Sequence, residues 1–138
     1  MEKLMDLMPK LFFVCHKALE NKYESLDLTH QQAKILYSIY YHKNAIQKKL
    51  CDTTFIEPPT LSRNIDALVQ KGLAQRSVDP QSRRSFNIEL TPGGETAVKK
   101  IIDIIDSVEK DLLSYISPRE KDSLINIINK IVKGGMND

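Results

Sequence analysis

The stretch from Pro58 to Gly94, PPTLSRNIDALVQKGLAQRSVDPQSRRSFNIELTPGG, decides the fold. Its first part predicts a short helix, because two prolines suit the first helical positions and Gly72 suits the residue after the end. Between them, leucine and isoleucine recur at helical spacing and form one apolar stripe. The outer side and flanks of this helix therefore carry mostly polar side chains.

Two strand-like segments follow this helix, at residues 73–78 and 85–90, the second with alternating apolar and polar side chains. The residues between them, Asp79-Pro80-Gln81-Ser82, favour a turn, because proline fixes φ and aspartate bonds to its own backbone. Arg83 and Arg84 come directly after the turn. The pattern predicts a basic two-stranded hairpin next to the helix.

A polar-faced helix beside a basic hairpin predicts contact with double-stranded DNA. Short polar side chains let a helix approach base edges in the major groove, and hairpin arginines can enter the minor groove or bind phosphate. Arg63 is the expected base or phosphate contact, and Arg84 the expected minor-groove contact. The alternative is an ordinary surface helix with a solubilising arginine pair. The expected DNA-binding residues are Thr60, Ser62, Arg63, Asp66, Gln70, Arg83 and Arg84.

The distribution of charge supports this segment as the contact region. The net charge of the chain is only +2, so there is no global basic signal. Residues 60–90, however, hold more basic than acidic residues, and most of the basic ones flank the hairpin. The basic residues of this segment are Arg63, Lys71, Arg76, Arg83 and Arg84.

Several short motifs follow one another in a characteristic order: Leu28-Thr29-His30-Gln31-Gln32, Thr60-Leu61-Ser62-Arg63, Leu68 to Leu73 with Lys71-Gly72, Asp79-Pro80, Arg83-Arg84, and Leu90-Thr91 followed by Gly94. Together they resemble the MarR family of winged-helix transcription regulators over nearly the whole chain. The resemblance implies a mainly α-helical fold with a small β-hairpin wing. It also implies a repressor whose affinity for DNA a small ligand lowers.

The chain departs from the family pattern in the wing, the turn and the recognition helix. Ser82 stands where the wing usually has an aspartate that orients the arginines. Thr54 and Phe55 stand where the turn between the two helices often has leucine and glycine. Val69 stands where the family often has an acidic residue. These differences concern local geometry, and the order of elements is unaffected.

Helices precede and follow the winged helix-turn-helix at residues 28–94. Residues 1–27 and 95–138 are apolar on more than one helical face, and a single domain of 138 residues cannot easily bury all of that surface. We therefore expect these segments to form a homodimer, which would read a pseudo-palindromic operator. Pro9 should kink the first helix or mark its start, and Gly134-Gly135 should end the last one.

The two helices before the recognition helix have clear signals. A capping box at Thr29 begins a helix that runs to about His42, and residues 45–53 form a shorter one. Tyr37 and Tyr40 lie on one face of the longer helix. They either fill the core or line a pocket for an aromatic ligand.

The two cysteines and three histidines lack the spacing of a metal site. Cys15 lies on an apolar stripe and Cys51 at a small core position, so no structural disulfide is expected. A redox-sensing subgroup of the family carries a cysteine in the first helix, but nearer to the position of Met5. His30, at a helix start, should be solvated or touch a phosphate.

The remaining features narrow the class of function. No leader or long apolar segment is present, so we expect a cytoplasmic protein with no membrane partner. There is no phosphate-binding glycine loop or nucleophile elbow, so we expect neither an enzyme nor a cofactor. Alternatives to a DNA-binding repressor are a winged-helix protein-interaction module without DNA binding, a cysteine-based redox-sensing regulator, and an enzyme with an unrecognised site.

Overall fold

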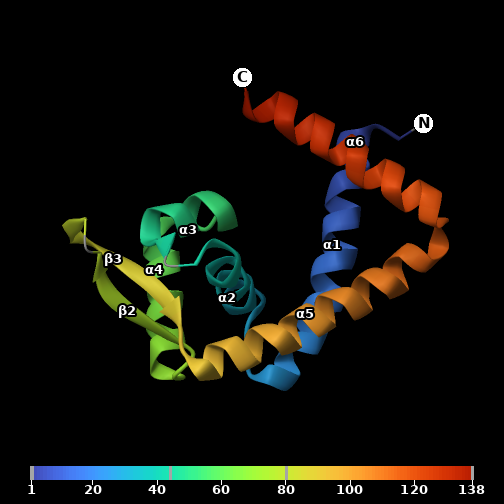
Figure 1. Cartoon of the computed structure of the whole chain (residues 1–138). Helices are drawn as coiled ribbons and strands as arrows, with labels where there is room; N and C mark the ends of the chain where they lie inside the picture. Colours follow the sequence, from blue (N-terminus) through green and yellow to red (C-terminus); the bar gives the residue numbers. More distant parts are fainter. Residues whose placement is uncertain (1, 44, 80, 138) are drawn as a thin grey trace. The chain divides into compact units, whose positions relative to one another are not determined.

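The computed structural model describes residues 2–43, 45–79 and 81–137, with the backbone alone at Asp79 and at 82–85. The chain divides into two compact units, Met1–Ile105 and Asp106–Asp138, and the division falls inside helix α5. Figure 1 shows a largely helical chain with one small sheet. The predicted fold class, mainly α with a β-hairpin wing, is confirmed.

The first unit contains the winged helix. Its elements are α1 (Leu4–Tyr23), the 3₁₀ turn η1 (Glu24–Leu26), α2 (His30–His42), β1 (Ala45–Ile46), α3 (Gln47–Thr54), α4 (Pro58–Gln70), β2 (Ala74–Asp79), β3 (Ser82–Leu90) and the first part of α5 (Pro92–Leu112). The antiparallel sheet has the strand order β1-β3-β2. In Figure 1 the hairpin of β2 and β3 projects beside α4.

The sheet has one more strand than the sequence predicted. Residues 45 and 46, predicted to begin a helix, instead form β1, and α3 begins at Gln47. Ala45 pairs with Ile88 and Ile46 with Asn87, which satisfies part of an edge of β3 that would otherwise be unpaired. The wing is therefore attached at its base to the chain just before the helix-turn-helix.

The predicted boundaries of α2 and α4 are confirmed. At α2, Thr29 Oγ1 accepts from the Gln32 backbone N–H at 3.1 Å, and Gln32 Oε1 accepts from the Thr29 N–H at 3.2 Å. Helix α4 begins with Pro58, and it ends before Gly72, whose φ is 75°. There the Leu73 N–H donates to the Leu68 carbonyl oxygen at 2.9 Å, which closes the helix end.

The apolar stripe of α4 is the centre of the core. Leu61, Ile65 and Leu68 are all 0% exposed. Burial of each such side chain stabilises the fold by about 1.5–3 kcal/mol, so this stripe fixes which face of α4 points outward. Other members of the core cluster are Ile35, Leu36, Ile39, Leu50, Ile88, Val98 and Ile101.

Close packing of backbone joins the end of α4 to the start of α5. Thr91 Oγ1 accepts from the Gly94 N–H at 3.1 Å and donates to the Gly72 carbonyl oxygen. A Cβ atom at Gly94 would lie 1.9 Å from the Leu73 carbonyl oxygen, so only glycine fits. Helix α4 and the wing strands are therefore held together at their common base.

Helix α1 exposes a long apolar surface within this unit. It begins at Leu4 and continues through Pro9, so proline does not mark its start. The turn before Pro9 is already formed, since Asp6 Oδ2 accepts from the Lys3 N–H at 3.2 Å, and loss of one helical hydrogen bond at proline does not end it. The exposed apolar residues are Leu4, Met5, Leu7, Met8, Leu11, Phe12, Phe13 and Val14.

The second unit contains the end of α5, the 3₁₀ turn η2 (Leu113–Tyr115) and α6 (Pro118–Met136). A capping box begins α6, with Ser117 Oγ accepting from the Glu120 N–H at 3.1 Å. Gly134 and Gly135 do not end α6, because glycine costs a helix only about 1 kcal/mol per residue and does not forbid it. Exposed apolar residues of α6 are Leu124, Ile125, Ile127, Ile128, Ile131, Val132 and Met136.

Candidate nucleic-acid interface

The outer face of α4 is polar. Arg63, Asp66 and Gln70 are exposed, whereas Thr60 and Ser62 are half-buried at the flanks of the buried stripe. Arg63 Nη2 lies 3.4 Å from Thr60 Oγ1 and can donate to it, which directs the guanidinium toward the first turn of the helix. The structure thus places the five predicted α4 residues around one outward face, and their contacts with DNA remain predictions.

Asp66 has a partner on the wing. Its Oδ1 lies 2.6 Å from Arg76 Nη2, which joins α4 to β2. An ion pair with this exposure contributes at most about 1 kcal/mol, so its main effect is geometric. It also neutralises a carboxylate on the face that we expect to meet phosphates. The sequence placed Asp66 on this face but did not reveal its partner.

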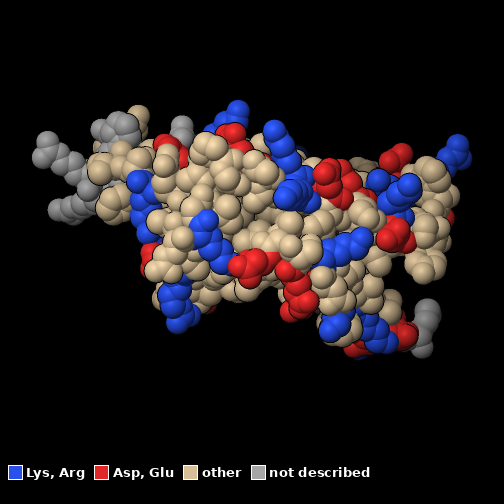
Figure 2. Space-filling model, turned by 90° about the horizontal axis from the view of Figure 1, so that it is seen from below, with Lys and Arg blue, Asp and Glu red and all other residues tan. Residues whose placement is uncertain are grey.

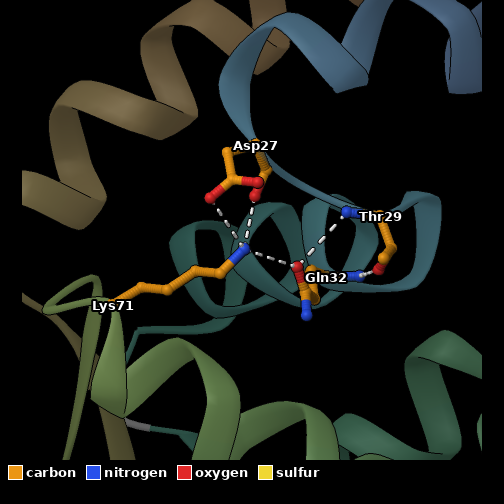
Figure 3. Close-up of polar contacts among 4 residues, drawn as sticks. All are labelled: Asp27, Thr29, Gln32 and Lys71. Carbon is orange, nitrogen blue, oxygen red and sulfur yellow. Dashed lines mark hydrogen bonds and ion pairs between the residues drawn. The ribbon is translucent and has the colours of Figure 1, made fainter.

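Two of the basic residues in the segment 60–90 therefore contact other residues of the same chain. Arg76 pairs with Asp66, and Lys71 turns back toward the start of α2, as Figure 3 shows. Their charges are already partnered, which leaves Arg63 as the exposed arginine of α4. Partners ten or more residues distant cannot be read from local sequence.

The wing consists of β2 and β3, with an irregularity in register between Val78 and Asp79. Arg83 and Arg84 lie in β3, but their side chains are outside the described part of the chain, as is Pro80. On the face shown in Figure 2, lysine and arginine are scattered among acidic side chains, and the described residues form no continuous basic patch there.

A cavity of about 420 Å³ lies between α1, α2 and the start of α4. Phe12 and Phe55 contribute aromatic rings to its lining, and His16, His30 and Lys34 contribute nitrogen atoms. The ring centroids of His16 and His30 are 4.2 Å apart. The volume falls in the range of small-molecule sites in proteins.

His30 is half-buried against other rings, so the prediction that it is solvated was wrong. Its Nδ1 is buried and has no hydrogen-bond partner among the described residues. Burial lowers the pKa of His30 below its ordinary value of 6.5, and His16 and Lys34 lower it further, while Glu20 acts in the opposite direction. His30 is therefore mainly neutral at pH 7, and its buried Nδ1 is unpaired among the described residues.

Phe55 forms the turn between α3 and α4 in an unusual conformation. Its φ is 57°, and its side chain is 73% exposed. This left-handed conformation costs a non-glycine residue about 1–2 kcal/mol. Thr54 compensates in part, because its buried hydroxyl donates to the Leu50 carbonyl oxygen and accepts from the Ile56 N–H at 3.3 Å. Thr54 and Phe55, which stand in place of the family's leucine and glycine, thus preserve the turn, and Phe55 adds a ring to the cavity.

A second cavity, of about 510 Å³, lies between the end of α2, β3 and the start of α5. Tyr40 lines it together with Lys43, Lys99, Glu89 and others. Tyr37 instead packs against the core. Of the two tyrosines proposed for an aromatic pocket, only Tyr40 borders one of these cavities.

The cysteines are both free and half-buried. Cys51 packs against the core, as predicted. Burial, followed by the nearby Asp52 carboxylate, raises the pKa of the Cys51 thiol, which keeps it protonated and unreactive. Among the described residues, no group of His, Cys, Asp and Glu side chains could hold a metal ion. In the same part of the chain, no helix is long and apolar enough to cross a membrane.

Helices α3 and α4, their tight turn and the β2–β3 hairpin define a winged helix-turn-helix protein. The MarR family model matches residues 28–86. Similar solved structures include a complex of S. aureus MepR with DNA, with a TM-score of 0.85 and 26% identity over 97% of this chain and 99% of that one. A MarR transcriptional regulator from Methanosarcina mazei has a TM-score of 0.90 and 22% identity, over 97% and 96%.

A third similar structure is that of Bordetella bronchiseptica BpsR, whose DNA binding is regulated by 6-hydroxynicotinic acid. Its TM-score is 0.86 and its identity 19%, covering 95% of this chain and 99% of that one. The likeness extends to both terminal helices as well as the winged helix. Residues 28–86 thus match the MarR family of winged-helix transcriptional regulators, and nearly the whole chain shares the fold of these solved structures.

Proposed function

We propose that this protein is a homodimeric, cytoplasmic repressor that binds a pseudo-palindromic operator and releases it when a small aromatic ligand binds. The observation that carries the proposal is the outer face of α4. Its buried stripe fixes the helix against the core, while Arg63 and Gln70 face outward beside the hairpin. The complex of S. aureus MepR with DNA supports this use of the fold.

In the proposed complex, α4 enters the major groove and the wing lies over the adjacent minor groove. Arg63 contacts a base or a phosphate, and the half-buried Thr60 and Ser62 act at short range. Arg84 enters the minor groove, and Arg83 binds phosphate or stabilises the hairpin. Asp66 acts by holding Arg76, and so the wing strand, against the helix.

The dimer is supported by apolar surface that each unit leaves exposed. On α1, Met5, Phe12 and Phe13 are between 65% and 74% exposed. On α6, Ile131 is 60% exposed. A monomeric protein seldom exposes such continuous apolar helix faces, and a second copy of the chain would cover them.

The cavity beside α1 is the proposed ligand site. Phe12 and Phe55 suit the faces of an aromatic ring, and Lys34 and His30 suit an acidic or polar substituent. Because Thr60 also lines the cavity, a ligand there touches the first turn of the recognition helix. A ligand that prefers one position of this turn shifts the protein toward the DNA-free form. The regulation of BpsR by 6-hydroxynicotinic acid supports this ligand class.

Fluorescence anisotropy tests the DNA part. Wild-type protein, Arg63→Ala, Arg84→Ala and a Lys100→Ala control are titrated onto DNA from upstream of the protein's own gene and onto scrambled DNA, at two salt concentrations. We expect selective, salt-sensitive binding by wild type and control, and a loss of about 1–3 kcal/mol for Arg63→Ala. Arg84→Ala should abolish selective binding.

Equal weak binding to both DNAs, unchanged by Arg84→Ala, would contradict the proposal and favour a protein-interaction module. Addition of 6-hydroxynicotinic acid or benzoate to the same complex tests ligand release, with Lys34→Met as the variant expected to respond less. Release that is identical in Lys34→Met and wild type would remove the cavity beside α1 from the mechanism.

A further inference from the structure

Lys71 follows the last residue of α4 and reaches back to the junction between α1 and α2, as Figure 3 shows. Its Nζ donates to the Asp27 backbone carbonyl oxygen. The same atom lies 3.3 Å from Gln32 Oε1 and 3.7 Å from Asp27 Oδ2. One ammonium group thus joins the end of the recognition helix to a segment 39 to 44 residues earlier in the chain.

The acceptors of Lys71 are held in place by their own surroundings. Asp27 has a left-handed backbone with φ 56°, and its N–H donates to the Glu24 carbonyl oxygen at 3.0 Å. Gln32 is 8% exposed, and its Oε1 also accepts from the Thr29 N–H at 3.2 Å. A single oxygen therefore belongs both to the cap of α2 and to the contact with α4.

A second contact reaches the same turn of α2 from the middle of α4. Asn64 Nδ2 donates to Gln31 Oε1 at 3.2 Å. The residue before Gln31, His30, packs its ring against that of His16 of α1 at a tilted angle. Three consecutive residues at the start of α2 therefore contact α1, the middle of α4 and the residue that follows α4.

The direction of the Lys71 side chain distinguishes it from a DNA-contacting lysine. Its side chain is 32% exposed, and its ammonium points to protein oxygens of the α1–α2 junction. It also follows the C-terminus of α4, where a positive charge is favourable beside the last free carbonyl groups. These contacts suit orientation of the helix and leave phosphate contact to other residues.

We propose that Lys71 is a positioning residue, which fixes the angle of α4 on the α1–α2 junction and thereby sets the spacing of the two recognition helices in the dimer. This inference rests on the proposed function. A helix of 13 residues is about 20 Å long, so a rotation of about 10° at its anchored end moves the other end by about 3 Å. That is close to the rise of one base pair, and half-sites lie about 34 Å apart.

The test uses a series of operators in which the two half-sites are separated by the natural spacing or by one or two added base pairs. Affinities are measured for wild type, Lys71→Met, Lys71→Arg and the charge-matched control Lys100→Met. In Lys71→Met, the ratio of affinities for natural and altered spacing should fall toward one. Lys71→Arg keeps a cation of similar reach and should restore the ratio, and Lys100→Met should leave it unchanged.

The ratio separates positioning from other roles of Lys71. If the residue only stabilised the fold, Lys71→Met would lower Tm and the active fraction but leave the ratio unchanged. If it bound phosphate, affinity would fall equally for every spacing and the salt slope would fall by about 1. Either result overturns the inference. Wild-type protein without DNA binding or spacing preference would overturn the proposed function, and this inference with it.

Discussion

Helices α1 and α4 are both amphipathic and belong to the same unit, yet their apolar faces have opposite surroundings. Leu61, Ile65 and Leu68 of α4 are 0% exposed, whereas Met5 and Phe12 of α1 are 74% and 68% exposed. The core that supports α4 is complete within one chain. The surface of α1 is not covered by its own unit. Folding of the winged helix and the proposed dimerisation should therefore respond to different substitutions.

The largest expected effect is on the stability of the fold, at the buried stripe of α4. Ile65→Ala should lower the free energy of unfolding by about 2–5 kcal/mol, because it leaves a cavity at a side chain that is fully buried. Urea denaturation of the purified protein measures the change. Val69→Ala, on the exposed side of the same helix, is the control and should change stability by about 0.5 kcal/mol or less. Equal losses in both variants would contradict this description of α4.

A substitution on the exposed face of α1 should affect the stability of the monomer less and should weaken the dimer. Phe13→Glu should preserve the folded monomer and weaken the dimer at least about tenfold, or about 1.4 kcal/mol, because it places a charge in the proposed interface. Analytical ultracentrifugation measures the dimer constant and circular dichroism the fold. Lys48→Glu, an exposed change on α3, should leave the dimer intact. If the wild type is monomeric, or if Phe13→Glu forms a dimer of normal strength, the apolar face of α1 is not the dimer interface and has another partner.

The smallest effect is expected at His30 of α2, whose ring lies against His16 of α1. Its folded-state pKa is lower than the ordinary value of 6.5, so below about pH 6.5 the unfolded chain binds more protons. Stability should therefore fall as pH is lowered from 6.5 toward the folded-state pKa. His30→Phe, which keeps an aromatic ring but cannot titrate, should reduce this fall, whereas His42→Phe should retain it. Thermal melts from pH 7.5 to 5 would show whether the two variants differ.

Features with a local cause were predictable from sequence. The cap at Thr29, the prolines that begin α4 and the closure at Gly72 each depend on neighbouring residues, and all were predicted. The failures have non-local causes. Ala45 becomes part of a strand because Ile88 of β3, more than 40 residues later, pairs with it. Glycine ends a helix only when the chain turns there, and α6 continues through Gly134.

The candidate site divides in the same way. Helical spacing was enough to place Arg63 and Gln70 on the outer face of α4. It could not show that Lys71 and Arg76 are engaged within the protein, because their partners depend on how α4 packs against α2 and the wing. His30 was misjudged for the same reason, since its buried environment comes from α1. The sequence gives the number of basic side chains in this segment. The packing of the folded chain decides which of them are free to contact DNA.

The close approach at Gly94 also bears on how this gene can vary over evolutionary time. Every mutation of that codon to another amino acid would push a side chain into the Leu73 backbone, so purifying selection should hold it fixed. A Cβ at Gly134 or Gly135 would meet no other atom of the chain within 4 Å. Those codons should drift, and a comparison of related genes should find one glycine constant while the other two change.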